Sequence, residues 1–549
     1  MHKPNQHLLH PSATERKFRD VAARYYDQTF NRFPIEGSVA GRHEFDGEVG
    51  HARMTELEQQ IRLVESSLAA VEDLPVQDFS AGGILDRRAF LANLRLERMQ
   101  LVELDRWRND PQIYINAAAE SIHHLLARHA RNLAPVAEAL YSRFRKIPRY
   151  LDEAAACVHR PEPLWQRLAA RNAPAVASMF RAVEEPLSKV LPNVRRPALK
   201  KAIDDAANAA EAYAAHVGRL RPAKAGSFAI GEERLMRLMR ERLGLDWSPR
   251  EAASFARRHA EKLHEAMRVE ARRFDTRRTP AEILQRAREE WKPAGSLIEA
   301  YRSMVYAVRD RFAEAGWIDF PRGENLLVIP VPAFMREQFP TAAYSSPGAL
   351  DPDQTGIFWV NDLGSLEGSA KSRAAEVAQH FGIELTCAHE AYPGHHLQFI
   401  RQNRHPSLAR RMAHHAVYYE GWTLWCEQMM ADLGSDENPY LRLTQLNDEL
   451  WRTWRVVIDV GLHTGTVGYE HACRLLQREV GFTAARARGD VNWYTSAPGV
   501  PMAYLIGKLE LMRLKQRHVD SGAMELREFN DWVLSFGAIP WRWIEESGL

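Results

Sequence analysis

Hydrophobic positions in the first part of the chain return every three or four residues, from Ser12 to about Trp317. The stretches "MTELEQQIRLVESSLAAVEDL" (54–74) and "PALKKAIDDAANAAEAYAAHVGRL" (197–220) show this spacing most clearly. A spacing of this kind places apolar side chains on one face of an α-helix. It therefore predicts that residues 1–316 form a helical N-terminal region.

The pattern changes after Gly316. The short runs "NLLVIPVP" (325–332) and "GIFWVND" (356–362) are rich in β-branched and aromatic residues and are bounded by Pro, Gly and Asp, which is typical of strands. The segment between them, "YSSPGALDPDQTG" (344–356), reads as a loop, and helical spacing returns from about Ser372. We therefore expect a mainly α fold with one small β-sheet, at about 325–362, inside a second region, 317–549.

Composition excludes several classes of protein. Lys and Arg number 73 against 71 Asp and Glu in 549 residues, a formal charge of +2, which argues against nucleic acid or an anionic membrane as partner. The start, "MHKPNQHLLHPSATERKFRD" (1–20), has no apolar stretch of signal-peptide length, and no segment of the chain approaches the roughly 18 apolar residues that span a membrane, so we expect a cytoplasmic protein. Its four cysteines are too scattered for a disulfide framework or a cysteine zinc site: Cys157, Cys387, Cys426 and Cys473.

The stretch "CAHEAYPGHHLQF" (387–399) comes close to the zinc-protease pattern H-E-x-x-H, but Pro393 stands where the second histidine belongs. On a straight helix His395 is about 120° out of register with His389, and His396 is in register but about 10 Å further along the axis. Because proline interrupts helical hydrogen bonding, we expect a kink or bulge that carries His395 round to the face of His389. The alternative is that these histidines are ordinary polar residues at a helix break.

A third metal ligand is available downstream. The helical stretch "AVYYEGWTLWCEQM" (416–429) carries Glu420 and Glu427 on one face. Glu420 is flanked by tyrosine, glycine and tryptophan, a setting in which an unpaired carboxylate is costly. A site with two histidines from one segment commonly takes a third ligand from another helix.

Four stretches together resemble a known family: "HEAYPGHHLQ", "YYEGWTLWCEQ", "RVVIDVGLHTG" and "YTSAPGVPMAYLIGKLELMRL". In this order they look like the bacterial domain-of-unknown-function family 885, which is regarded as similar in fold to helical gluzincin-type zinc peptidases such as thimet oligopeptidase and thermostable carboxypeptidase. The resemblance implies a metallopeptidase-like assembly whose N-terminal region roofs a channel. It also implies one zinc ion per chain, or another divalent metal, held by His389, His395 and Glu420. Glu390 would be the general base, and Tyr504, or in second place Tyr494, would stabilise the oxyanion.

A polar stripe, Arg455, Asp459 and His463, runs along the helical stretch "WRVVIDVGLHT" (454–464) among apolar neighbours. Asp459 could orient a metal-bound histidine or hold His463, while Arg455 and His463 could contact substrate or form a structural network. His463 is also a candidate for oxyanion stabilisation. Three further residues complete the candidate set as substrate-binding or supporting groups: His396, Glu427 and Lys508.

These residues lead us to expect a zinc-dependent hydrolase that cleaves peptide or amide bonds of short peptides, as an oligopeptidase or carboxypeptidase. The strand at 356–362 could hold an extended peptide at the sheet edge. Two alternatives remain open, a metal-dependent amidohydrolase of a small metabolite and a non-catalytic helical binding protein with a decayed site. The sequence gives neither the oligomeric state nor the identity of the substrate.

Overall fold

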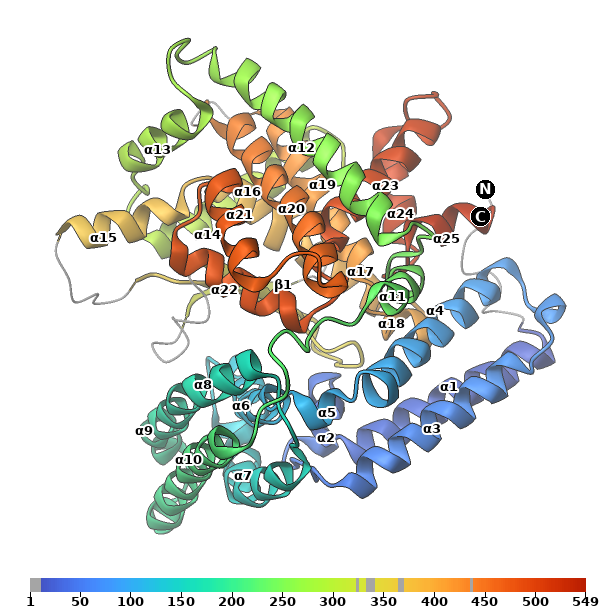
Figure 1. The fold of residues 1–549 in the computed structure, drawn as a ribbon, viewed down its shortest axis with the longest axis vertical. Coiled ribbons are helices and arrows are strands. Elements are labelled where there is room, and N and C mark those ends of the chain that lie inside the picture. Colours follow the sequence, from blue (N-terminus) through green and yellow to red (C-terminus); the bar gives the residue numbers. More distant parts are fainter. Residues whose placement is uncertain (1–10, 322–324, 332–340, 364–369, 435–437) are drawn as a thin grey trace.

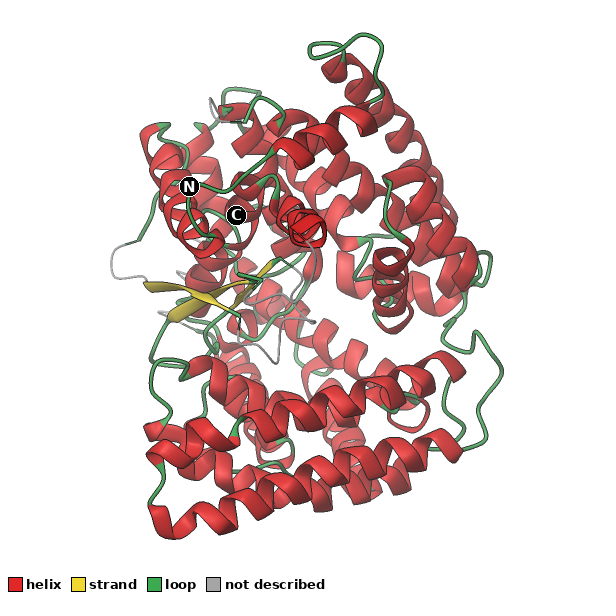
Figure 2. Cartoon of the chain, turned by 90° about the vertical axis from the view of Figure 1, so that its left-hand side faces the viewer, coloured by secondary structure: helices red, strands yellow, loops and turns green. Residues whose placement is uncertain are grey.

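The computed structural model describes residues 11–321, 325–331, 341–363, 370–434 and 438–549. Helices dominate it, and one small sheet lies among them (Figures 1 and 2). The mainly α fold with a small sheet is therefore confirmed. Residues 1–10 and Pro332, the last residue of the first predicted strand, lie outside the described part of the chain.

The helices are numbered in chain order. The first group is α1 (Ala13–Arg32), α2 (Pro34–Val39), α3 (Met54–Glu72), α4 (Ala81–Arg98), α5 (Arg106–Asn109), α6 (Gln112–Arg128), α7 (Ala137–Cys157), α8 (Pro163–Ala182), α9 (Glu184–Val190), α10 (Arg196–Arg219), α11 (Glu232–Leu243), α12 (Pro249–Ala271), α13 (Pro280–Glu290) and α14 (Leu297–Glu314). After the sheet follow α15 (Ala370–Val377), α16 (Ile383–Glu390), α17 (His395–Asn403), α18 (Leu408–Arg411), α19 (Ala416–Leu433), α20 (Leu441–Thr464), α21 (Tyr469–Val480), α22 (Ala484–Ser496), α23 (Ala503–His518), α24 (Leu526–Leu534) and α25 (Trp541–Glu546).

Several helices begin where the sequence supplies a capping box. At α1 the Ser12 side chain accepts the backbone N–H of Glu15, and the Glu15 carboxylate accepts the backbone N–H of Ser12. This reciprocal pair satisfies two amide groups that a helix start leaves without partners. The same arrangement starts three later helices: α12 with Ser248 and Glu251, α13 with Thr279 and Glu282, and α14 with Ser296 and Glu299.

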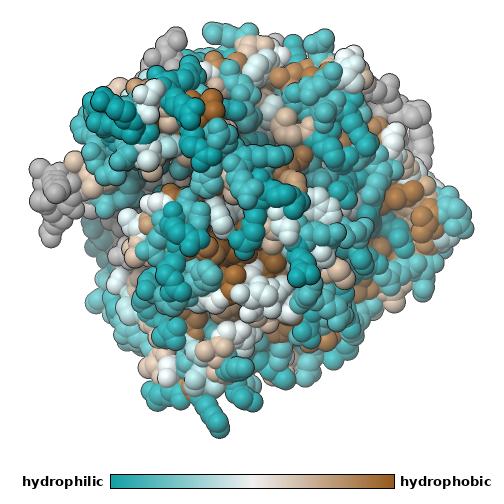
Figure 3. Space-filling view, turned by 45° about the horizontal axis from the view of Figure 1, so that its top comes forward, coloured by the Kyte–Doolittle hydropathy of each residue, from teal (hydrophilic) through white to brown (hydrophobic). Residues whose placement is uncertain are grey.

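Figure 1 shows the early helices, α1 to α10, at one end of the molecule and the later helices at the other. The largest apolar core combines buried residues of α12, α19, α20 and α23 with residues of α4 and α8, so the two ends share packing. The face in Figure 3 is mostly hydrophilic, with hydrophobic residues grouped in a hollow near its centre. The boundary at residue 316 stays a prediction.

The sheet has three strands, β1 (Asn325–Pro330), β2 (Ala342–Ser345) and β3 (Thr355–Val360), in the order β1-β3-β2. β1 and β3 were predicted and pair in parallel, whereas β2 begins before the segment predicted as a loop and pairs antiparallel with β3. β3 is central and has a partner on both sides, so our expectation that it offers a free edge to a peptide is wrong. β2 packs beside α16, and this places the sheet next to the motif helices.

Two glycines bring α19 and α23 into backbone contact. A Cβ atom added to Gly507 would lie 2.0 Å from the carbonyl oxygen of Val417 and 2.8 Å from the Cα of Gly421. A Cβ atom on Gly421 would lie 2.4 Å from the carbonyl carbon of Gly507. Only glycine at both positions permits this approach, and the crossing carries Glu420 on α19 towards Tyr504 on α23.

Gly507→Ala is expected to destabilise the protein, because the new methyl group meets backbone atoms that cannot move without separating the two helices. We expect a loss of about 1–3 kcal/mol in the free energy of unfolding, measured by urea denaturation. Gly489→Ala is the matched control, since Gly489 lies in α22 with no atom within 4 Å of the added Cβ. Alanine there favours the helix, and equal effects of the two substitutions would contradict the crossing.

Candidate metal centre

The unusual motif forms two short helices joined by a tight turn. α16 ends at Glu390, the chain turns through Ala391 to Gly394, and α17 begins at His395. The expectation of one kinked or bulged helix is therefore wrong in form, although the predicted break at Pro393 is present. Gly394 packs so closely on the end of α16 that a Cβ atom would lie 1.8 Å from the carbonyl oxygen of His389. The indole N–H of Trp422 donates to the carbonyl of Pro393 at 2.8 Å and ties the turn to α19.

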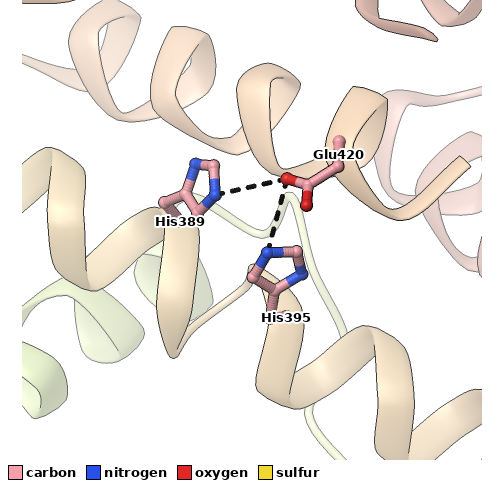
Figure 4. A group of neighbouring side chains, drawn as sticks. All are labelled: His389, His395 and Glu420. Atoms are coloured by element: carbon pink, nitrogen blue, oxygen red, sulfur yellow. Dashed lines mark ion pairs between the residues drawn. The ribbon is translucent and has the colours of Figure 1, made fainter. Parts of the chain in front are cut away.

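This turn brings His389 and His395 together opposite Glu420, as Figure 4 shows. The Nε2 atoms of both histidines lie 3.6 Å from Oε2 of Glu420, and the two imidazole rings are nearly perpendicular, at 84°. All three side chains are buried, and their ligand atoms lie within 4.8 Å of one another. The structure thus groups the three residues that the sequence analysis selected as metal ligands.

The donor atoms fit a divalent cation such as zinc. At metal–ligand distances of about 2.0–2.1 Å, two ligands in tetrahedral geometry lie roughly 3.3 Å apart, close to the spacing of these atoms. Oε2 of Glu420 is buried and, within the described part of the chain, has no hydrogen-bond partner. A buried carboxylate oxygen facing two imidazole nitrogens is suited to a cation between them.

Glu427 and Arg452 support His389 from the other side. Nδ1 of His389 lies 2.7 Å from Oε1 of Glu427, and this oxygen also accepts a hydrogen bond from Arg452 Nη2 at 3.3 Å. Burial alone would lower the pKa of His389, but the neighbouring carboxylates of Glu420 and Glu427 outweigh it and raise the pKa to about 10. A carboxylate at Nδ1 fixes the ring and leaves Nε2 for a metal, which agrees with the supporting role predicted for Glu427.

His396 points away from this group. Its Nδ1 lies 3.0 Å from the hydroxyl of Tyr344 on β2, and a Cβ atom on Gly356 of β3 would lie 2.5 Å from the same nitrogen. Burial lowers the pKa of His396 to about 3, so the ring stays neutral. His396 therefore anchors α17 to the sheet, and the geometry favours His395 over His396 as the second ligand.

Glu390 and Tyr504 border the three donors. Glu390 is the last residue of α16, directly after His389, and it is half-buried. Tyr504 lies on α23, whose contact with α19 at Gly421 and Gly507 brings it near the Glu420 carboxylate. Burial and this carboxylate raise the pKa of Tyr504 well above its ordinary value, so the phenol remains a proton donor.

The predicted polar stripe on α20 divides into two parts. The guanidinium carbon of Arg455 lies 4.5 Å from the ring centre of Tyr504, and its Nε donates to the hydroxyl of Tyr494 at 3.0 Å. Asp459 accepts the backbone N–H groups of Gly499 and Met502 ahead of α23, although burial raises its pKa to about 8. Asp459 thus positions the start of the helix that carries Tyr504.

His463 and Lys508 have buried protein partners. Nε2 of His463 lies 3.0 Å from the carbonyl oxygen of Tyr494 and 3.5 Å from Oδ1 of Asp459, and burial lowers the pKa of the ring to about 4. The catalytic role of His463 stays a prediction. Lys508 is 3% exposed and pairs with Glu449.

Sequence reasoning missed Arg452 and Glu449. Both lie on α20 with Arg455, and Glu449 also binds Nε2 of His259 at 2.9 Å. Arg452 precedes Arg455 by one helical turn, so extending the polar stripe towards the start of the helix would have found it. Nothing local in the sequence indicates that His259, on α12, meets Glu449.

The fold and this site define a mainly helical protein with a buried two-histidine, one-glutamate cluster. Residues 34–547 match the model of the family described as "Bacterial protein of unknown function (DUF885)", and the chain belongs to this family. The comparison with curated proteins gives no match.

Two solved structures share the fold. A "putative lipoprotein of unknown function" from Shewanella oneidensis is 19% identical, with a TM-score of 0.76 over 96% of this chain and 99% of its own. The "putative lipoprotein" from Colwellia psychrerythraea is 17% identical, with a TM-score of 0.77 over 97% of this chain and 98% of its own.

These neighbours overturn the expectation of a cytoplasmic protein. Both are described as a "putative lipoprotein", and this description does not agree with a cytoplasmic location. We therefore withdraw that expectation. Among the helices of the described residues, none has the length and apolar character needed to cross a bilayer.

Replacing the neighbouring histidines separately should distinguish their roles. We expect His395→Ala to weaken zinc binding by more than the 10- to 100-fold typical of supporting residues, because it removes one of three donors. His396→Ala should retain zinc and instead lose about 1–3 kcal/mol of stability, because Tyr344 is left without its buried partner. Zinc content after dialysis and thermal unfolding report the two effects, and loss of zinc in His396→Ala alone would reverse the assignment.

Glu427→Gln should weaken zinc binding without removing a ligand. The amide keeps the shape of the side chain but loses the charge that holds His389 and pairs with Arg452, so we expect the affinity to fall about 10- to 100-fold. Competition with a chromogenic chelator measures the affinity. An unchanged dissociation constant would show that Glu427 does not support the centre.

Proposed function

We propose that the protein is a zinc-dependent hydrolase that cleaves peptide or amide bonds of short peptides. The observation that carries the proposal is the cluster of His389, His395 and Glu420, with Glu390 and Tyr504 beside it. Two histidines, one glutamate and an adjacent free glutamate form the residue set of hydrolytic zinc sites. When bound, the ion would act as a Lewis acid and lower the pKa of a water molecule towards neutrality.

Each neighbouring side chain has a task in this proposal. Glu390 would accept a proton from the attacking water and return it to the leaving amine. Tyr504, kept protonated by its raised pKa, would donate a hydrogen bond to the oxyanion that develops on the scissile carbonyl. Glu427 and Arg452 would hold His389 in one orientation throughout.

Glu390→Gln should reduce turnover of a mixed peptide library by at least about 100-fold, because the amide cannot accept the proton. Zinc content should stay at the wild-type level, since Glu390 is not one of the three grouped donors. Mass spectrometry of the library and metal analysis of the same sample give both readouts. Cleavage by Glu390→Gln at the wild-type rate would contradict the assignment of Glu390 as the base. Absence of any peptide cleavage by the wild-type protein would contradict the proposed function.

A further inference from the structure

Arg455 lies in an aromatic enclosure beside the metal centre. Its side chain is on α20 and only 5% exposed. Four rings surround its guanidinium carbon, at distances from the ring centres of 4.0 Å (Trp451), 4.5 Å (Tyr504), 5.3 Å (Trp493) and 5.7 Å (Tyr494). Aromatic faces stabilise a cation and hold it in place, but they leave its N–H groups free to bind an anion.

Among the described residues only Nε of Arg455 has a hydrogen-bonded partner, and its two terminal nitrogens have none. Nε donates to the hydroxyl of Tyr494, and that hydroxyl donates to Oδ2 of Asp490 at 2.6 Å. The same oxygen lies 3.9 Å from Nη2 of Arg455, too far for a hydrogen bond. Nη1 is buried and has no partner among the described residues. A buried cationic donor without a partner in the chain is satisfied by an acceptor from outside it, such as a water molecule or a bound anion.

Tyr504 connects this open donor to the proposed metal centre. One face of its ring contacts Arg455, and its helix, α23, crosses the helix of Glu420 at Gly421 and Gly507. Tyr504 therefore lies between the open guanidinium and the helix that carries Glu420. Consecutive Cα atoms of a peptide are about 3.8 Å apart. If the scissile bond lies at the metal centre, the carboxylate of the next residue therefore extends a few ångströms beyond it, in the direction of Arg455.

We propose that Arg455 binds the free C-terminal carboxylate of the substrate, so that the protein removes residues from the C-terminal end of peptides. This inference rests on the proposed function and specifies its substrate class. A planar guanidinium matches the geometry of a carboxylate, whereas a peptide amide offers no matching charge. In the reaction one water adds across one C–N bond: its hydroxyl joins the acyl carbon and its second proton goes to the amine of the released residue.

A binding experiment tests Arg455 without relying on turnover. The zinc-loaded Glu390→Gln variant is titrated with N-acetyl-trialanine and with its C-terminal amide by calorimetry. We expect the acid to bind at least tenfold more tightly, and Arg455→Gln in the same background to bring the acid to the affinity of the amide. Equal binding of acid and amide, no binding of either, or an equal loss for both in Arg455→Gln would overturn the proposal.

Two further variants keep this result specific. Arg486→Gln is the matched control, because Arg486 also lies over the Trp451 ring, at 5.0 Å, but is exposed. It should preserve the preference for the acid, and loss of that preference in Arg486→Gln alone would move the anion site away from Arg455. Arg455→Lys keeps the positive charge but loses the planar guanidinium, so it should retain part of the preference for the acid over the amide. If Arg455→Gln does not fold, Arg455→Lys serves as the test in its place. A full preference for the acid in Arg455→Lys would exclude recognition by the planar guanidinium.

Activity of the wild-type protein separates this inference from the proposed function. Cleavage of the acid at least tenfold faster than of the amide supports both. Cleavage of both at equal rates would overturn the role of Arg455 while the hydrolase proposal stands. No cleavage of either, with the binding preference intact, would overturn the hydrolase proposal and leave an anion site at Arg455.

Discussion

The backbone contact between α19 and α23 at Gly421 and Gly507 controls the geometry of the whole site. Any side chain at these positions would separate the helices, because the nearest atoms belong to the main chain. With the helices in contact, Glu420 and Tyr504 belong to one surface although they are far apart in sequence. The same two helices carry Glu427 and Lys508. The contact between α19 and α23 therefore fixes the positions of Glu420 and of these two charged side chains together.

Charges buried around this crossing occur in groups in which opposite signs compensate. Glu427 lies between His389 and Arg452, and Glu449 lies between Lys508 and His259. Burial raises the pKa of each glutamate, but the neighbouring cations outweigh it and hold both pKa values below the ordinary value. A rigid, compensated interior suits a site whose ligands must keep one orientation. Arg455 differs because aromatic rings and one phenol, in place of a hydrogen-bonded carboxylate, surround it.

The sequence was most informative where chemistry and local pattern coincide. Helical spacing was enough to predict the fold class, whereas the set of three grouped donors came from the resemblance to family 885. It was least informative where the outcome depends on distant partners. β2 is only four residues long and exists because Tyr344 and its neighbours pair with β3. His463 and Lys508 were candidates for contact with substrate, yet His463 meets the carbonyl of Tyr494 and Lys508 meets Glu449, partners that local periodicity does not indicate.

The motif itself shows how His389 and His395 can meet although their spacing is two residues longer than in H-E-x-x-H. In one continuous helix the spacing from His389 to His395 would direct the rings to different faces. Ending α16 at Glu390 and starting α17 at His395 frees the second histidine from the register of the first. Adjacent residues on a helix point about 100° apart, so the position of this start directs His395 to Glu420 and His396 to the sheet. The apparent defect in the pattern is thus the feature that gives two neighbouring histidines separate roles.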